Sequence, residues 1–303
     1  VFNLESYRNA VIVVLIASFC SLLYASLNYG DFVSFNQRLG SDSAFEETRG
    51  LDPLSTGYLA SMGGSWAFLL FVLKRDALPI NTYLRFALGG GFVALSIVGL
   101  TLGASRGSAL ALVIGLLMVG FGMGVSATRG STIKIIFGSI LFTAILGFML
   151  QSTEISETLL FQRIELAIDQ VLYSTYSSNI RLELARDSLA GIKENPLFGS
   201  GFTPPSFSMY AHNLFLEAFL ATGIIGGSLY LVSIGIVLVY AFKLIIRRDI
   251  GSFFGVMFVN YFVASNFSFS IVSSSGFWLS LVLVLSYTKW VDHQRSQRRN
   301  IAR

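Results

Sequence analysis

Three arginines and one histidine are the side chains of this sequence best suited to bind an anion. Arg106 follows Ser105 in a short Gly-Ala-Ser-Arg-Gly turn, Arg181 and Arg186 lie in a long polar stretch, and His212 immediately precedes an apolar segment. Guanidinium groups bind phosphate oxygens through paired N–H donors, so these residues predict an anionic ligand beside the apolar segments. A lipid-linked pyrophosphate is the ligand class that fits both features.

The composition predicts an all-α, polytopic membrane helix bundle with about eight spans. Of the 303 residues, 53% are hydrophobic and only 13% are charged, whereas soluble domains carry about 25% charged residues. A spanning helix needs roughly 17–25 residues. We therefore interpret eight apolar segments as membrane spans, namely 9–27, 56–73, 84–102, 108–126, 132–150, 213–242, 253–269 and 274–288.

Glycines recur inside several of these segments. Small residues in membrane helices allow neighbouring helices to approach closely, so we expect these glycines to mark close helix–helix packing. They are Gly89-Gly90-Gly91, Gly120 with Gly124, and Gly223 with Gly227.

The distribution of charge predicts the orientation of the chain. With the C-terminal tail inside and the spans alternating, the inner side holds 14 of the 21 basic and 4 of the 17 acidic residues, leaving 7 and 13 outside. Short cytoplasmic loops of membrane proteins are enriched in Lys and Arg. The net charge of +4 therefore reflects topology and does not indicate nucleic acid as a partner. The three arginines and His212 then fall on the outer side, and the basic tail is expected near anionic membrane lipids.

The longest connection between apolar segments, residues 151–211, is expected to contain two amphipathic helices. Apolar residues recur at helical spacing over 155–172, and a second helix is predicted from residue 178 or 179 to about 193. Asn195-Pro196 and Gly199-Ser200-Gly201 then interrupt helix formation. Long loops are usually functional, so we expect this outer-face loop to lie over the bundle.

Sequence neighbours distinguish the two arginines of this loop. No carboxylate stands three or four residues from Arg181 on its helix, whereas Arg186 has Glu183 three residues before it. We therefore interpret Arg181 as functional and Arg186 mainly as the partner of a local ion pair. Arg106, beside the membrane, either reaches headgroup phosphates or serves a substrate.

His212 has two interpretations at this stage. A lone histidine at a membrane interface is commonly a polar anchor, although its imidazole can also take part in chemistry. Glu217, farther along the same segment, is an ionisable group inside a span and therefore a candidate functional residue. It could instead pair with one of the arginines.

Three segments together resemble the O-antigen ligase and polymerase family. They are the Ser-Arg-Gly hairpin in TLGASRGSALALVIGLL (101–117), the arginine-led helix and Asn-Pro-Leu-Phe-Gly-x-Gly turn in NIRLELARDSLAGIKENPLFGSGF (179–202), and the His-Asn, Leu-Glu and Thr-Gly-x-x-Gly motifs in AHNLFLEAFLATGIIGG (211–227). The segments follow the family order, and the resemblance covers about 84–240. Because family members usually have more spans, we expect that N-terminal spans are missing from this chain, which starts at Val1 without a signal peptide.

The resemblance implies an inverting, metal-independent glycosyltransferase of the bacterial inner membrane, with its active site on the periplasmic face. The donor would be a glycan on undecaprenyl pyrophosphate, and the acceptor a sugar hydroxyl on lipid A–core or another glycan. No cofactor is expected. Arginines would take the place of a metal ion, since no Asp-x-Asp pair is present to hold one. The single cysteine, Cys20, forms neither a disulfide nor a thiol–metal site.

The resemblance also implies roles for individual residues. Arg106 and Arg181 would hold the pyrophosphate, and His212 would lie at the reacting hydroxyl, so these three are the expected catalytic residues. Whether His212 is the general base or only orients the acceptor stays open, and Glu217 is the competing candidate. Substrate binding is expected to involve Arg106 and Arg181 together with Arg186, Asn213 and Glu217.

Two other classes of protein, and two members of the family, are alternatives. Residues 103–107 match the Gly-x-Ser-x-Gly motif of serine hydrolases, with His212 as a partner for Ser105, but that motif works at a strand-to-helix elbow. A transporter of a lipid-linked glycan would be expected to show internal repeats, which we do not find in the sequence. Within the family, one dominant outer loop favours a ligase, and a polymerase is the alternative.

The sequence divides into four expected parts. Residues 1–83 hold the N-terminal spans and the first outer loop, and 84–242 form the ligase-like core with the outer loop 151–211. Residues 243–290 hold the C-terminal spans, and 291–303 form the basic cytoplasmic tail.

Overall fold

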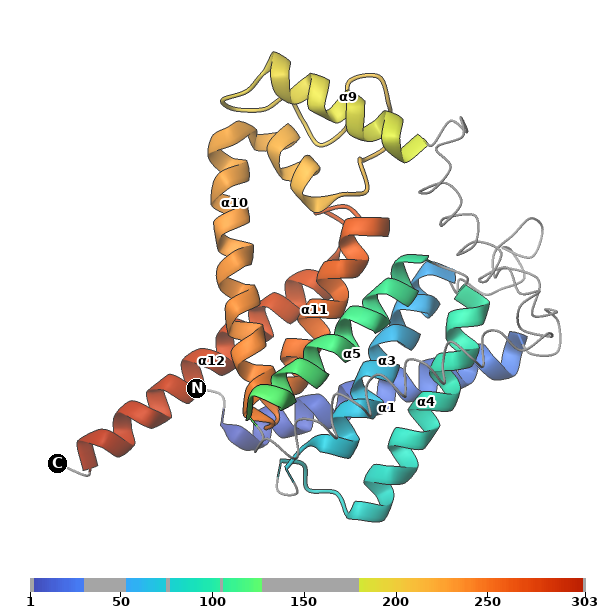
Figure 1. Ribbon diagram of the computed structural model, residues 1–303, viewed down its shortest axis with the longest axis vertical. Helices are drawn as coiled ribbons and strands as arrows, with labels where there is room; N and C mark the ends of the chain where they lie inside the picture. Colours follow the sequence, from blue (N-terminus) through green and yellow to red (C-terminus); the bar gives the residue numbers. More distant parts are fainter. Residues whose placement is uncertain (1–2, 30–52, 75–76, 104–105, 127–179, 302–303) are drawn as a thin grey trace.

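Every regular element in the described part of the chain is an α-helix (Figure 1). The computed structural model describes residues 3–29, 53–74, 77–103, 106–126 and 180–301. An all-α protein is therefore confirmed for these residues. The helices are α1 (Leu4–Tyr29), α3 (Pro53–Val72), α4 (Thr82–Gly103), α5 (Arg106–Ser126), α9 (Ile180–Glu194), α10 (Leu214–Arg247), α11 (Gly251–Ser268) and α12 (Ser275–Ile301).

Seven of the eight expected spans coincide with a helix. The eighth, 132–150, lies outside the described residues. Among the residues that the structure describes, the segments long and apolar enough to cross a membrane are Leu4–Leu27, Thr82–Leu100 and Leu214–Arg247, with Gly107–Gly122 a shorter apolar helix. The protein is thus a membrane helix bundle, but the expected number of eight spans is not confirmed. Serine, glycine and asparagine residues in α3 and α11 reduce the apolar character of these two helices.

Helix α11 lies at the centre of the bundle, packed against α3, α5, α10 and α12. The Ser61 hydroxyl on α3 donates to Asn260 Oδ1 on α11 at 2.7 Å, and Asn260 Nδ2 donates to the Ser65 hydroxyl at 3.3 Å. Gly115 on α5 packs against Ser65 and Asn260. Hydrogen bonds between small polar side chains join helices in apolar surroundings, so these residues fix α3, α5 and α11 relative to one another.

Aromatic side chains fill the space around this polar contact. Trp66 is 2% exposed and meets Phe92 of α4 and Phe253 of α11 edge-on, with ring centroids 6.4 and 6.1 Å apart. Phe258 and Phe277 are also buried and stack at 5.6 Å. Removing a buried aromatic ring typically costs about 3–5 kcal/mol, so this cluster is a major source of stability.

The glycines expected to allow close packing behave in different ways, and Gly90, with open space around its Cβ position, does not pack closely. A Cβ at Gly89 or Gly91 would lie 2.7 Å from the ring of Phe71 or Phe19, so close packing is confirmed at these two positions. At Gly223 the expectation of simple helix packing is wrong. Its φ of 63° and ψ of −164° break α10 into a short first part and a long second part.

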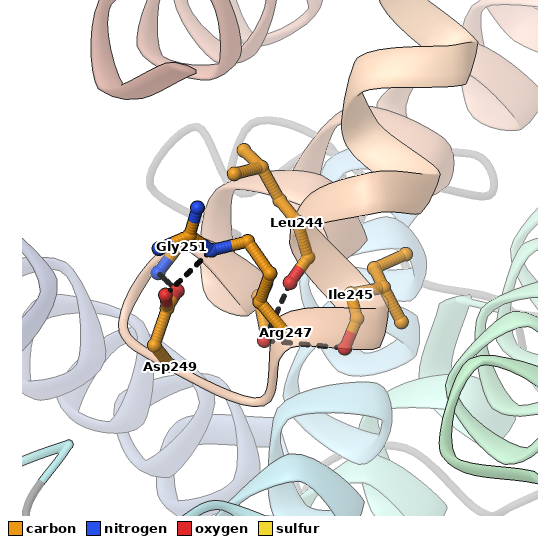
Figure 2. Close-up of polar contacts among 6 residues, drawn as sticks. Leu244, Ile245, Arg247, Asp249 and Gly251 are labelled. Atoms are coloured by element: carbon orange, nitrogen blue, oxygen red, sulfur yellow. Dashed lines mark hydrogen bonds and ion pairs between the residues drawn. The ribbon is translucent and has the colours of Figure 1, made fainter. Parts of the chain in front are cut away.

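The turn between α10 and α11 closes the end of the bundle opposite α9 (Figures 1 and 2). Arg247 Nε and Asp249 Oδ2 form an ion pair at 2.8 Å, and Asp249 Oδ1 accepts from the Gly251 N–H at 2.9 Å. Arg248, with a left-handed φ of 57°, ends α10 and donates from Nη2 to Val72 O of α3 at 2.8 Å. This basic turn ties α10 and α11 to the end of α3. It lies on the side that the charge distribution predicts to be cytoplasmic.

Three of the boundaries expected from the sequence lie within helices. Residues 84, 243 and 291 fall inside α4, α10 and α12. The basic tail in particular is helical, because α12 continues without a break from Ser275 to Ile301. Its first part packs against the bundle through Phe277, Val284 and Tyr287, and its last part is exposed.

Candidate substrate-binding site

Helix α9 confirms the second helix expected in the outer loop. Its buried face is formed by Leu184, Ser188 and Gly191, whereas Arg186 is exposed. With 3.6 residues per turn, position 181 lies within about 60° of positions 184 and 188, and position 186 lies on the opposite side of the axis. The helical register therefore puts Arg181 on the face of α9 that packs on the protein and Arg186 on the outer face.

The ion pair expected between Glu183 and Arg186 is not formed. Both side chains are exposed, and within the described part of the chain the ion pair that forms joins Arg247 to Asp249. Exposed pairs of this kind contribute little free energy, so nothing strong holds the two side chains together. Arg186 is therefore not explained by a local ion pair.

Helix α9 and the connection that follows it are joined to the first part of α10. A Cβ at Gly191 would lie 2.8 Å from Leu220 Cδ1 and 3.1 Å from the Pro205 ring. Asp187 accepts twice from Ser206, from the backbone N–H at 2.7 Å and from the hydroxyl at 2.9 Å. These contacts hold the connection between α9 and α10 against α9.

Backbone hydrogen bonds lock the Asn-Pro-Leu-Phe-Gly-Ser-Gly turn to the break in α10. The Ser200 N–H donates to Leu220 O at 2.7 Å, and the Ile224 N–H donates to Pro196 O at 2.8 Å. A break in a membrane helix leaves backbone groups that need partners. The turn supplies them, so the two motifs form one structural unit.

Two glycines make this approach of the two segments possible. Gly199 has φ +75°, and a Cβ there would collide with the backbone of Leu220 and Ala221. Gly223 has φ +63°, and a Cβ there would collide with the backbone of Leu197. L-residues with a side chain are disfavoured in this region of φ, so glycine is required at both positions.

His212 stands at the end of the connection, directly before α10, in a backbone conformation uncommon for residues other than glycine. Its φ is 54°, one of two positive values among the described non-glycine residues. Left-handed backbone costs roughly 1–2 kcal/mol for a residue with a Cβ. The half-buried imidazole packs edge-on against Tyr210, with ring centroids 4.5 Å apart. Strained residues of this kind cluster at functional sites.

Asn213 is the N-cap of α10. Its Oδ1 accepts from the backbone N–H groups of Phe215 and Leu216, both at 3.0 Å. An asparagine cap of this type typically contributes about 1 kcal/mol to helix stability. Only its Nδ2 group is left for the substrate contact expected from the sequence.

Glu217 lies in the first turns of α10 and is fully buried. Its Oε2 accepts from the Ile271 N–H at 2.8 Å, which joins α10 to the turn between α11 and α12. The Ser270 hydroxyl and the backbone N–H groups of His212 and Asn213 lie near the same carboxylate. The ion pair considered from the sequence is not formed with any arginine whose side chain the structure describes.

Arg106 is the first residue of α5, and the glycine after it fixes its position. Gly107 packs against the Tyr58 hydroxyl of α3, and a Cβ there would lie 3.0 Å from Phe267 Cβ of α11. The Tyr58 hydroxyl also donates to Ser268 Oγ at 2.7 Å. The start of α5 is thereby held against the end of α11, next to the turn that contacts Glu217.

These contacts bring the three motif segments to one end of the molecule. In Figure 1, α9 lies across this end, with the start of α5 and the turn between α11 and α12 below it. The link runs from Gly107 to Phe267, along the end of α11 to Ile271, and from Ile271 to Glu217. Arg106 and His212 therefore belong to elements that meet, and position 181 lies on the face of α9 that packs against α10 and the connection before it.

The described residues offer no cluster of side chains that could hold a metal ion. No three His, Cys, Asp or Glu side chains come together in this part of the chain. Cys20 is exposed on α1, away from the motifs.

Several residues that shape this site were not identified from the sequence. Asp187 fastens the connection, Tyr210 packs on His212, and Ile271 binds Glu217. Tyr210 stands two residues before His212, a spacing that could have signalled a contact in an extended segment. The sequence gives no indication of the role of Ile271, because its backbone N–H, and not its side chain, binds Glu217.

Comparison with protein families places these residues in one domain. Residues 91–231 match the family model described as O-antigen ligase, and this range contains the three arginines, His212 and Glu217. Comparisons with curated proteins and with solved structures gave no match. The resemblance of the three motifs to the O-antigen ligase and polymerase family is thus confirmed over residues 91–231.

Proposed function

We propose that this protein transfers a glycan from undecaprenyl pyrophosphate to a sugar hydroxyl of lipid A–core at the outer face of the bacterial inner membrane. The observation that carries the proposal is the meeting of three family motifs at one end of the bundle, through the contacts of Gly107 with Phe267, of Glu217 with Ile271 and of Ser200 with Leu220. Within the matched range, these motifs hold the residues suited to bind pyrophosphate and to activate a hydroxyl.

At the anomeric carbon, the reaction forms one bond and breaks another. The acceptor oxygen attacks this carbon from the face opposite the pyrophosphate, and the bond from the carbon to the phosphate oxygen breaks. The electron pair leaves with the pyrophosphate, so the anomeric configuration is inverted. Arg106 and Arg181 bind the phosphate oxygens, and preorganised donors of this kind stabilise charge that develops in the transition state.

His212 takes the proton of the acceptor hydroxyl in this proposal. An imidazole that titrates near neutral pH suits a general base. The strained backbone at φ 54° and the packing of Tyr210 support a fixed imidazole. Glu217 is the less suitable base, because its buried carboxylate already accepts from Ile271. We assign Glu217 to holding the turn between α11 and α12 beside the substrate.

The hydrolase alternative is weakened by the elements that flank its motif. Helix α4 ends at Gly103 and α5 begins at Arg106, so the Gly-x-Ser-x-Gly stretch connects two helices. A nucleophile elbow requires a strand before the turn. A Ser105→Ala variant should therefore keep its transferase activity.

Reconstitution with defined substrates tests the proposal. Purified protein in lipid vesicles receives undecaprenyl-pyrophosphate-linked polymer and truncated lipid A–core, and glycan attached to the core is measured. Transfer to the core is the expected result. Extension of the donor chain with the core unchanged would instead assign a polymerase. Movement of the donor across the bilayer without any transfer would assign a transporter, and either outcome would overturn the ligase proposal.

A further inference from the structure

A cavity of about 620 Å³ opens at the end of the molecule opposite α9, where α3 ends and α4 begins. Cavities of roughly 300–1,000 Å³ are typical of sites for small molecules. Its walls combine one cationic residue, two hydroxyl groups and several apolar side chains. The lining includes Leu70, Phe71, Thr82, Tyr83, Arg85 and Phe86.

Arg85 is held rigidly in the wall of this cavity. Its guanidinium donates from Nε to Leu70 O at 3.2 Å, and from Nη2 to Leu70 O and Leu73 O at 2.7 and 2.9 Å. The side chain is only 8% exposed. No hydrogen bond to a described residue uses Nη1, and no described carboxylate forms an ion pair with Arg85. The carbonyls of Leu70 and Leu73 hold the guanidinium in place, and Nη1 is the donor left for a ligand in the cavity.

The start of α4 adds a second anion-binding feature to the same cavity. Asn81 Oδ1 caps the helix by accepting from the Leu84 N–H at 2.7 Å. The first turn of a helix presents further N–H groups and the positive end of the helix dipole, which together favour phosphate. Thr82 and Tyr83, in this first turn, line the cavity together with Arg85.

The remaining wall is apolar and exposed. Phe71 and Phe86 are 40% and 56% exposed, and their ring centroids lie 5.5 Å apart. Tyr83 is 88% exposed at the same end of α4. Because α4 contains a segment long and apolar enough to cross a membrane, exposed rings at its first turn are expected at the membrane interface.

We propose that this cavity binds an anionic phospholipid, with the phosphate on Arg85 and the start of α4, and an acyl chain along Phe71 and Phe86. The surrounding charge supports this occupant, because Lys74 and Arg247 lie at the same end of the bundle. Basic pockets between membrane helices on the cytoplasmic side are typical sites for anionic headgroups. The site lies at the opposite end of the molecule from the candidate catalytic residues.

Native mass spectrometry of the full chain tests the proposal. Protein purified in detergent is mixed with equal amounts of phosphatidylglycerol and phosphatidylcholine, and the retained lipid is counted. Wild type should retain phosphatidylglycerol in preference, and Arg85→Gln should reduce that preference about fivefold. Arg248→Gln is the matched control, because Arg248 also donates to the end of α3 but does not line the cavity. Equal retention of both lipids by wild type, or equal effects of both variants, would overturn the proposal.

A second variant covers the case in which Arg85→Gln disturbs the end of α3. Phe86→Glu leaves the Arg85 hydrogen bonds in place and puts a negative charge in the exposed wall of the cavity. It should lower phosphatidylglycerol retention, whereas Phe121→Glu, at a comparably exposed ring on α5, should not. If Phe86→Glu binds phosphatidylglycerol as wild type does, the cavity is not the site. Neither measurement of lipid retention depends on transferase activity. The proposal of a lipid site and the proposed transfer reaction can therefore be disproved separately.

Discussion

Gly199 and Gly223 lie against each other's chain segments, although one follows α9 and the other interrupts α10. Each has a positive φ, and each would collide with backbone of the opposite segment if it carried a Cβ. The hydrogen bonds of Ser200 to Leu220 and of Ile224 to Pro196 flank this contact. The position of α9 over the bundle, and with it the position of Arg181, depends on these two glycines.

Substitution of either glycine should therefore impair both folding and activity. Gly223→Ala should lower the free energy of unfolding by at least about 1 kcal/mol, since alanine must adopt a left-handed φ in addition to meeting the Leu197 backbone. Gly235→Ala is the control, because this glycine lies in the same helix with open space around it. Thermal unfolding and glycan transfer measured side by side give the comparison. Wild-type behaviour of Gly223→Ala would show that the break in α10 is not required.

The two faces of α9 predict different consequences for its arginines. Arg181→Ala, and likewise Arg106→Ala, should lower the rate of transfer about 10²–10³-fold, the typical effect of losing one preorganised donor. Lysine should restore little activity, because it lacks the planar fork of the guanidinium. Arg186→Ala should have a much smaller effect, since Arg186 is on the exposed face. Equal losses in Arg181→Ala and Arg186→Ala would mean that the substrate approaches α9 from its outer side.

His212 should affect the chemical step more than donor binding. His212→Ala is expected to lower the rate about 10²–10⁴-fold, the usual contribution of general acid–base catalysis. Binding of the pyrophosphate donor should persist, because the arginines make those contacts. Wild-type activity should fall toward acidic pH as the imidazole becomes protonated. Glu217→Gln, which keeps an acceptor for the Ile271 N–H, should retain most activity; a loss as large as that of His212→Ala would make Glu217 the base.

The orientation of the chain can be checked with single cysteines. In a Cys20→Ser background, Thr203→Cys lies in the exposed connection after α9, and Ser296→Cys lies in the exposed end of α12. An impermeant thiol reagent added to intact cells should label the first variant and spare the second, because the charge distribution predicts that α9 is outside. Labelling of Ser296→Cys from outside would contradict the orientation and the periplasmic site.

Transfer should not require a divalent metal ion. The proposed charge stabilisation comes from guanidinium groups, so activity should survive excess chelator at full rate. The measurement is transfer to lipid A–core with and without chelator. If a chelator inhibits transfer and magnesium or manganese restores it, a divalent cation helps the arginines to stabilise the negative charge of the pyrophosphate.

The sequence by itself determined the helical membrane class, the family and the residues worth testing. Long apolar segments permit little other than helices in a bilayer, and short motifs such as Ser-Arg-Gly and Thr-Gly-x-x-Gly can be read without coordinates. The second loop helix was also predictable to within a residue of its C-terminal end, since amphipathic spacing and the Asn-Pro that follows are local signals.

Only the tertiary structure decided how these motifs meet. Gly223 looks like a packing glycine in sequence, but a turn preceding α10 supplies the partners that its break requires. The sequence suggested an ion-pair partner for Glu217 and another for Arg186. Glu217 instead accepts a hydrogen bond from the backbone N–H of Ile271 in a distant turn. Arg186 forms no ion pair with a described residue. Spacing along one helix shows which residues share a face, whereas contacts between segments far apart in sequence depend on how the helices pack.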